Sequence, residues 1–510
     1  MARVLPHAIV DEPPPQPATE GDGKELELKL ELDSSDAEAI VAAPLLGSAD
    51  IEVRDQHAIY FDTPSRALLK CGLSLRIRRV GETRIQTVKA ETGAAAGLFV
   101  RPEWEREVAD DRPIVDDFGA PLGALVDAQE LARLAPIFEV KVRRRLAQIQ
   151  CEGATIELAL DTGEISVAGR TTPVSEIELE LKEGDPALLF DVARLLGDQA
   201  PLQLGVLTKS ERGYRLLDDE LDKPLKSQPV RLTSEMSAAQ GFQAIARACL
   251  RQFCVNESIL RRTGNDIALH QARVALRRLR STFSIFREIL VDDHFEHLRG
   301  ELRWLAAELG EARNIDVLIG RLSKREGRPL KPARQAAYAE VETALASERT
   351  RALMVDLVEW IALGGWLSDK ASAALREEPL PMFAGQVLEK FRRKVKRRGR
   401  NLAHIEDEAR HELRIQAKKL RYATEFFAEL YAQPKPRRRH AAFLAALEAM
   451  QADLGDLNDL ATEPLVLARL GLEGSPTATA LAADHQSRDA LIRKAAEAHA
   501  ALIDVKRFWH

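Results

Sequence analysis

The sequence predicts an α+β protein of more than one domain, in which a closed antiparallel β-barrel precedes an all-helical bundle with an internal two-fold repeat. Three observations lead to this fold class. Several stretches between residues 25 and 182 alternate charged and aliphatic residues, which is the period of two typical of strands. From residue 233 onward, long segments rich in Ala, Leu, Arg and Glu have helical spacing instead. Within these segments one basic pattern occurs twice.

Residues 25–32 carry the clearest strand pattern, because leucines fill the even positions and charges the odd ones. A solvated outer face is the ordinary meaning of such a strand. Glutamate is a poor strand former, however, and carboxylates two positions apart lie about 7 Å from each other and repel by roughly 2 kcal/mol at an effective dielectric near 20. A face with Glu25, Glu27 and Glu31 therefore favours a bound cation, and a hard divalent ion with oxygen ligands fits best.

Later strands also place charges on a single face, and residues 176–182 nearly repeat the first stretch. The charges that share a face are Arg76 with Arg78, Lys89 alone, Arg101 with Glu103, Glu105 and Glu107, and Lys141 with Arg143 and Arg145. Such strands predict a closed barrel with a polar lumen. Because carboxylates bind metal while Arg and Lys bind phosphate oxygens, the expected ligand is a metal-complexed polyphosphate chain. A register slip of one residue would reverse each face.

At these residues the chain resembles a known family. Glu25-x-Glu27-x-Lys29 is similar to the signature of the CYTH superfamily, the triphosphate tunnel metalloenzymes. Later stretches resemble the further motifs of the superfamily and follow in the same order: residues 60–64, 72–78, 158–161, 176–182 and 209–214. The resemblance covers residues 24 to about 217, and it implies that the predicted barrel is a triphosphate tunnel.

The charges of the chain are unevenly distributed. Residues 1–230 hold 27 Lys and Arg against 42 Asp and Glu, so 27 − 42 = −15, and the remainder of the totals gives 46 − 37 = +9 for residues 231–510. The basic half should prefer polyanions. Residues 1–23 are rich in proline and acid and predict a disordered tail, and Pro224 and Pro229 predict a linker over residues 219–233. The domains expected between them are residues 24–218 and 234–510.

The repeat lies in the predicted helical domain. His270, Arg273, Arg277 and Arg280 recur as His411, Arg414, Lys418 and Arg421, at an offset of 411 − 270 = 141. Each set falls within an arc of about 80° of a helix, beside an apolar stripe. A solvated basic face is the usual meaning, but ordinary exposed faces mix both signs of charge. Further basic clusters occur at residues 392–398 and 437–440, without the interleaved aromatic residues that stack on nucleic-acid bases. Inorganic polyphosphate is thus the expected partner, and nucleic acid is not.

This repeat resembles the CHAD domain, the conserved histidine α-helical domain, over residues 234 to the end of the chain. The resemblance implies a two-fold helical bundle with a basic groove that binds polyphosphate. The role of His270 and His411 stays open between phosphate donors, helix-packing groups and, least favoured, metal ligands.

A CYTH module followed by a CHAD module resembles the two-domain inorganic triphosphatases of bacteria. The resemblance implies hydrolysis of tripolyphosphate to pyrophosphate and phosphate, with Mg²⁺ or Mn²⁺ as cofactor. The expected catalytic residues are Glu25, Glu27 and Lys29. The expected metal ligands are Glu25, Glu27, Asp161, Glu176, Glu178 and Glu180. The expected substrate contacts are Arg76, Arg78, Lys89, Arg101, Lys141 and Arg143 along the tunnel, with Lys209 and Arg212 near its mouth.

Two other functions stay open from the sequence. One is a CYTH enzyme acting on a nucleoside or thiamine triphosphate, including an adenylate cyclase. The other is a polyphosphate-binding or granule-associated scaffold with little catalysis. No apolar run approaches the length of a membrane span, no signal peptide is visible, and four cysteines without ligand-like spacing fit a reducing compartment. The expected location is the cytoplasm, with association with polyphosphate granules as an option.

Overall fold

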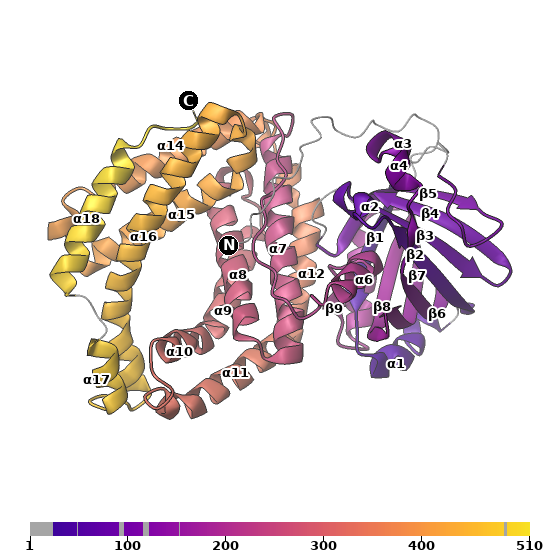
Figure 1. Ribbon diagram of the computed structural model, residues 1–510, viewed down its shortest axis with the longest axis horizontal. Helices are drawn as coiled ribbons and strands as arrows, with labels where there is room; N and C mark the ends of the chain where they lie inside the picture. Colours follow the sequence, from indigo (N-terminus) through magenta and orange to yellow (C-terminus); the bar gives the residue numbers. More distant parts are fainter. Residues whose placement is uncertain are drawn as a thin grey trace. The chain divides into compact units, whose positions relative to one another are not determined.

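The computed structural model describes residues 24–47, 49–90, 96–115, 122–151, 153–483 and 487–509, apart from the side chains of Lys24 and Glu25. The predicted tail, residues 1–23, lies outside this range. The contacts divide the chain into two compact units, the first ending at Leu221 and the second formed mainly by residues 222–510. Strands dominate the first unit and helices the second (Figure 1).

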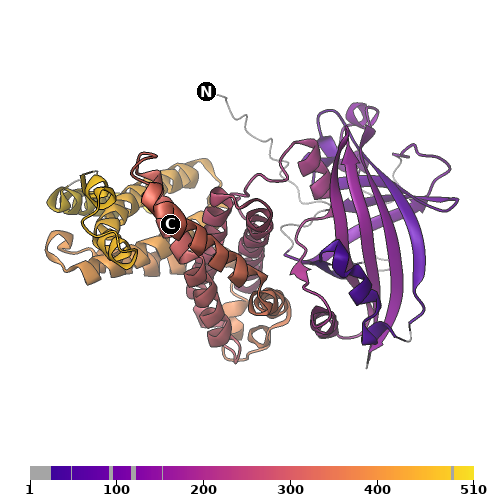
Figure 2. The same ribbon diagram turned by 90° about the horizontal axis from the view of Figure 1, so that it is seen from below.

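The first unit contains a closed antiparallel barrel of eight strands. Their order around the ring is β5-β4-β3-β2-β6-β7-β8-β1, and β1 also pairs with β5, which closes it. The short strand β9 adds to β1 at one end. Figure 2 shows the strands side by side in one curved sheet. The strands are β1 (Lys24–Glu31), β2 (Glu52–Asp62), β3 (Leu73–Val80), β4 (Thr83–Ala90), β5 (Leu98–Glu107), β6 (Ala135–Cys151), β7 (Ala154–Val167), β8 (Arg170–Glu183) and β9 (Gln203–Leu204). The predicted closed barrel is confirmed.

Apolar side chains cover much of the outside of this barrel. Leu28 and Leu30 of β1 are buried and do not line the cavity inside, so the alternation of β1 separates an aliphatic outer face from an ionised inner face. A second buried cluster, around Leu75, joins β2, β3 and β4 to short helices. The helices of this unit are α1 (Ala37–Val41), α2 (Ala67–Lys70), α3 (Leu122–Leu125), α4 (Ala128–Leu131), α5 (Ala187–Gly197) and α6 (Lys209–Leu217).

Helix α6 is fixed at its start and packed closely against the barrel. The Thr208 side chain accepts a hydrogen bond from the Glu211 N–H, and the Glu211 carboxylate accepts one from the Thr208 N–H. Gly213 allows the close packing, because a Cβ at this position would lie 2.3 Å from the ring of Phe138 on β6. The side chain of Lys209, the first residue of α6, is thereby held at the barrel interior.

The second unit is helical, and the predicted all-helical domain is confirmed. Within the described residues its α-helices are α7 (Ala238–Thr263), α8 (Asp266–Ile285), α9 (Phe295–Glu308), α10 (Gly310–Gly320), α11 (Lys331–Ala346), α12 (Glu348–Leu363), α13 (Ala373–Arg376), α14 (Leu380–Arg398), α15 (Asp407–Phe426), α16 (Pro434–Arg469), α17 (Pro476–Ala483) and α18 (Arg488–Asp504). Over the part of the chain that the structure describes, no helix is both long and apolar enough to cross a bilayer.

Helices α8 and α15 carry the two copies of the basic pattern. Their starts differ by 407 − 266 = 141 and their ends by 426 − 285 = 141, so both bounds agree with the offset found in the sequence. The segments that follow are less alike, because α9 and α10 of the first copy correspond to the single long helix α16 of the second. Helices α8 and α15 also contact each other.

Candidate functional site

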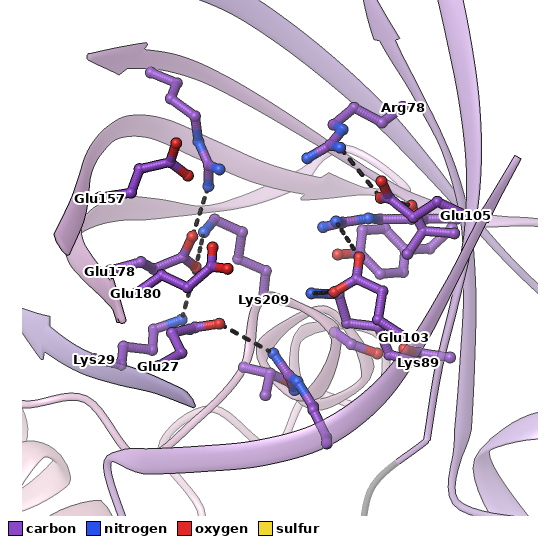
Figure 3. A pocket seen from close by; sticks show the side chains of 18 of the residues that line it. Glu27, Lys29, Arg78, Lys89, Glu103, Glu105, Glu157, Glu178, Glu180 and Lys209 are labelled. Atoms are coloured by element: carbon purple, nitrogen blue, oxygen red, sulfur yellow. Dashed lines mark hydrogen bonds and ion pairs between the residues drawn. The ribbon is translucent and has the colours of Figure 1, made fainter. Parts of the chain in front are cut away.

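The barrel encloses a polar cavity of about 240 Å³, lined by side chains from all eight strands of the ring and from α6. Charged groups of both signs face each other across it (Figure 3). Glu27, Glu157, Glu178 and Glu180 lie on one side, while Arg78 and Lys89 lie on the other. Strand alternation produces this arrangement, because every second residue of β1, β3, β4 and β8 points inward.

The acidic wall of the cavity is set by strand register. Glu27 of β1 lies opposite Glu180 of β8, Lys29 lies opposite Glu178, and Glu157 of β7 lies opposite Glu180. Burial raises the pKa of the Glu180 carboxyl, although Lys182 lies 2.6 Å from it. Glu157 and Glu27 also raise this pKa, so like charges lie close together on this wall.

A deeper group of carboxylates is held by cations. Oxygen atoms of Asp161, Glu176 and Glu178 lie within 4.8 Å of one another, which is close enough for a shared metal ion. Lys209 Nζ, however, lies 2.8 Å from both Asp161 Oδ2 and Glu178 Oε1 and also contacts Glu176. Further cations contact the group at distances of 2.5 to 3.3 Å: Lys29, Arg144 and Arg212. Four cations thus surround three carboxylates.

These cations outweigh the effect of burial on the carboxyl groups. Burial alone would raise the pKa of Glu178, but Lys209 and Arg144 hold the pKa well below its usual value. The pKa values of Asp161 and Glu176 are lowered in the same way, chiefly by Lys209. A divalent ion would be repelled by the surrounding ammonium and guanidinium groups, so this group of three fits a metal poorly.

The outer part of the acidic wall fits a metal better. Glu27 Oε1 is buried without a hydrogen-bond partner, and its other oxygen lies 3.8 Å from Arg101. A buried oxygen of this kind requires a cation or water. Glu27 and Glu180 together offer the carboxylate oxygens that Mg²⁺ and Mn²⁺ bind. Glu25 precedes Glu27 on β1, but its side chain lies outside the described part of the chain.

The arginine and lysine side chains opposite the acidic wall form the basic wall, and they make ion pairs with neighbouring glutamates. Arg78 Nη2 lies 3.2 Å from Glu105 Oε1, Arg76 Nη2 lies 3.7 Å from Glu103, and Lys89 also contacts Glu103. These pairs hold the cations at the cavity and offset the repulsion between their like charges. Phosphate oxygens are strong acceptors for the same N–H groups.

The structure places the two predicted substrate contacts on β6 outside the cavity. The side chains of Lys141 and Arg143 are 57% and 58% exposed and pair with Glu139 and Asp55 on the outer surface. The predicted facing of Lys141 and Arg143 was therefore wrong. Arg144, the next residue of β6, points inward instead. Its register partner on β7 is Asp161, and the two side chains form an ion pair.

Two predicted contacts on α6 also differ from expectation in position. Lys209 was expected near the mouth, but it is buried among the carboxylates of the deeper group. Arg212 does not line the cavity and instead contacts Glu176 and the carbonyl oxygen of Pro173. Both residues are placed to hold carboxylates.

Several cavity residues were not singled out as site residues from the sequence. They are Tyr60, Ser74, Thr87, Arg144, Glu157 and Lys182, together with Glu103 and Glu105, which were expected only to share a face with Arg101. The strand register would have identified some of them, because Thr87 lies opposite Glu105 and Lys89 lies opposite Glu103. Pairing of this kind follows from neighbouring strands and is absent from the pattern of any single strand.

In the helical unit, cations of both copies come together. Arg273, Arg277 and Arg414 all act on the Lys418 ammonium, which burial and these neighbours shift to a pKa of about 7. Burial, and then Arg313, Arg277 and Arg273, lower the pKa of His270 to about 4. His270 is thus neutral near pH 7 and does not add to the positive charge of this cluster.

The other predicted residues of the second copy are engaged elsewhere. His411 Nδ1 lies 3.1 Å from Asn458 Oδ1, which is within hydrogen-bond distance. Arg421 forms ion pairs with Glu425 and Glu448. Neither histidine has a carboxylate or second histidine arranged around it as a metal site within the described residues.

A closed barrel with an ionised interior, followed by a helical unit built on two copies of a basic helix, defines a two-domain class of protein. The family comparisons agree with this class. Residues 23–214 match the CYTH domain family and residues 244–468 match the CHAD domain family. The chain contains a CYTH domain followed by a CHAD domain.

Among curated proteins, the chain is similar to the inorganic triphosphatase of Haemophilus influenzae, with 31% identity over 159 residues. The match covers 31% of this chain and 44% of that protein, so the chain spans less than half the length of this relative. Among solved structures, the CHAD domain of Ricinus communis is 27% identical, with a TM-score of 0.46, and covers 56% of this chain and 97% of that chain. A Hippeastrum protein with a dominant triphosphatase activity is 18% identical, with a TM-score of 0.31, over 37% of this chain and 95% of that chain.

Proposed function

We propose that the barrel is an inorganic triphosphatase that hydrolyses tripolyphosphate to pyrophosphate and phosphate. The observation that carries the proposal is the cavity, in which an acidic wall with a partnerless buried Glu27 oxygen faces a wall of arginine and lysine. A linear phosphate chain presents negative oxygens to the second wall and metal-binding oxygens to the first. The inorganic triphosphatase named among the relatives supports the same reaction.

The basic wall binds and orients the chain of phosphates. Arg76, Arg78 and Lys89 exchange their contacts with Glu103 and Glu105 for phosphate oxygens. Phosphoryl transfer depends mainly on position and on stabilising the charge that develops on the transferred group. Cations fixed before the substrate arrives meet both requirements.

The acidic wall would hold Mg²⁺ or Mn²⁺ through Glu27, Glu180 and Glu25. A metal there would neutralise phosphate charge and lower the pKa of the attacking water. Lys29 lies beside these carboxylates, and its Nζ donates to Glu176 at a distance of 2.7 Å. This hydrogen bond fixes the Lys29 ammonium between the deeper carboxylates and the carboxylates proposed to bind metal. From there the ammonium contacts the terminal phosphate or orients the attacking water.

The lining favours an inorganic substrate over a nucleotide or thiamine triphosphate. Among the described residues that line the cavity, Tyr60 alone is aromatic, and the remainder are almost all charged or hydroxyl-bearing. A purine or thiamine ring would displace water from charged groups without stacking between aromatic side chains. A CYTH enzyme with such a substrate is the second candidate for this site.

A phosphate-release assay tests the proposal with matched carboxylate variants. Glu27→Gln should lower the rate on tripolyphosphate by at least about 100-fold, because it removes one charged ligand and keeps the shape. Glu164→Gln is the control, since Glu164 lies on the exposed face of β7. ATP, thiamine triphosphate and long polyphosphate are assayed in parallel, each with Mg²⁺ and with Mn²⁺. Equal activity of both variants, or faster release from ATP, would contradict the proposal.

For the helical unit we propose binding of inorganic polyphosphate, which would direct the protein to polyphosphate in the cytoplasm. The supporting observation is that Arg273, Arg277, Arg414 and Lys418 gather from both copies without a carboxylate ion pair among the described residues. Arg273→Gln combined with Arg277→Gln should abolish retention on a polyphosphate resin, whereas Glu27→Gln should not. Loss of hydrolysis without loss of retention in Glu27→Gln would also separate an enzyme from a scaffold.

A further inference from the structure

The last cation of the second basic helix is neutralised. Arg421 Nε lies 2.7 Å from Glu425 Oε1, and Arg421 Nη2 lies 3.3 Å from Glu448 Oε1. Glu425 is shared with Arg278 of α8. One guanidinium thus faces two carboxylates, and a phosphate group approaching Arg421 would meet both of them.

The equivalent residue of the first helix has the opposite surroundings. Arg280 has no carboxylate partner among the described residues. Burial, and then Arg303 and Arg299 of α9, lower its pKa. Lys419 of α15 is also near Arg280, and burial together with neighbouring cations lowers the pKa of Lys419 as well. Among the described residues, Arg299 is the one of these neighbours that forms an ion pair, with Glu296 at 2.7 Å, while Glu412 partly offsets the shift of the Lys419 pKa.

The difference between the surroundings of Arg280 and Arg421 follows from residues that differ between the two copies of the repeat. The offset of 141 that equates Arg280 with Arg421 places Ser284 at the position of Glu425. The offset of 454 − 309 = 145 that equates Leu309-Gly310 with Leu454-Gly455 places Arg303 at the position of Glu448. The first copy therefore has serine and arginine where the second copy has two glutamates.

Cations that form no ion pair with a carboxylate among the described residues continue from Arg280 along one face of α8. Arg273, Arg277 and Arg280 are spaced by four and three residues, so they follow one another over about 10 Å of the helix. Arg414 and Lys418 of α15 join them at Arg277, although Asp459 acts on both of these cations. We call these five residues the cation track: Arg273, Arg277, Arg280, Arg414 and Lys418.

We propose that polyphosphate binds along the cation track, so that it follows α8 past Arg280 and takes only Arg414 and Lys418 from the second copy, leaving Arg421 out. This inference rests on the polyphosphate role proposed for the helical unit. The two-fold repeat thus provides a one-sided binding surface, and the direction of asymmetry is set by Glu425 and Glu448.

A matched pair of variants in the full-length chain tests the asymmetry. Arg280→Gln and Arg421→Gln each remove one positive charge at the same position of the repeat, so their effects on the net charge are identical. Arg280→Gln should weaken binding to polyphosphate of defined length by about tenfold and lower the slope of log Kd against log salt by about 1, because one phosphate contact is lost. Arg421→Gln should change the affinity by less than about twofold and leave the slope unchanged, because no such contact is lost.

Two further variants separate charge from folding. Arg280→Lys keeps the charge and should retain the salt slope, whereas a merely structural role of Arg280 would not distinguish Lys from Gln in this way. Glu448→Arg supplies the second copy with the residue found at Arg303 and should tighten binding several-fold. Equal losses in Arg280→Gln and Arg421→Gln would overturn the one-sided surface while sustaining polyphosphate binding. Absence of binding by the unchanged protein would overturn both.

Discussion

Replacing Lys209 by methionine tests whether the deeper carboxylates of the barrel are held by side-chain cations. Lys209 Nζ contacts all three carboxylates of this group, two of them at 2.8 Å. Asp161 and Glu176 are inaccessible to solvent. Methionine keeps the length and apolar stem of the side chain but removes the charge, so three carboxylates are left with Lys29, Arg144 and Arg212.

The expected loss of stability is large. Removing one partner of a buried ion pair costs about 3 to 5 kcal/mol, because the remaining charges stay buried. The loss should depend on pH in one direction. The pKa values of these carboxyls are lowered in the folded protein, so their stabilisation is present above their ordinary values and is lost as the pH falls through the folded values. The difference between variant and parent should therefore be full at pH 7 and shrink only below about pH 4.5.

Amide hydrogen exchange in the intact protein measures this loss locally. Peptides from β7 and β8 report the free energy of opening of the strands that carry the three carboxylates. The measurement is made at pH 7 with EDTA, so that no divalent ion contributes. The reasoning is refuted if exchange in Lys209→Met matches that of the parent to within about 1 kcal/mol, which is the scale of an exposed pair.

Two other predictions concern ligand binding. Arg76→Gln should raise the KM for tripolyphosphate by at least about tenfold while Arg143→Gln changes it less than about twofold, because Arg76 lines the cavity and Arg143 lies outside it; steady-state kinetics with similar effects for both would show the assignment of faces to be wrong. Polyphosphate binding should weaken as the pH rises from 6 to 8, since burial and the neighbouring Arg414 and Arg277, opposed by Asp459, give Lys418 a pKa of about 7. Binding titrations of Lys418→Arg should lack this pH dependence, and an unchanged dependence would exclude Lys418 as its source.

The sequence predicts the inner face of β1 well and that of β6 poorly, for a physical reason. In β1 every charge falls on one face, so the period of two settles that Glu27 and Lys29 point inward. In β6 three consecutive arginines, residues 143–145, place cations on both faces. Only the partner strand decides between them, because Arg144 lies opposite Asp161.

The same limit applies to the helical repeat. The spacing within α15 correctly places Arg421 on the face of Arg414 and Lys418, but Glu448 belongs to α16. Periodicity describes one helix at a time, whereas neutralisation depends on the neighbouring helix. The deeper carboxylates show this too, since Lys209 reaches them from α6, far along the chain from β7 and β8.

Closure of the strand ring restricts how a ligand can arrive. Because β1 is hydrogen-bonded to β5 as well as to β8, the wall has no free edge at which strands could part without losing ladder bonds. A ligand must therefore reach the cavity through an end of the barrel and not through its wall. If the barrel acts on tripolyphosphate as proposed above, this unbranched chain can enter in this way, with one terminal phosphate first.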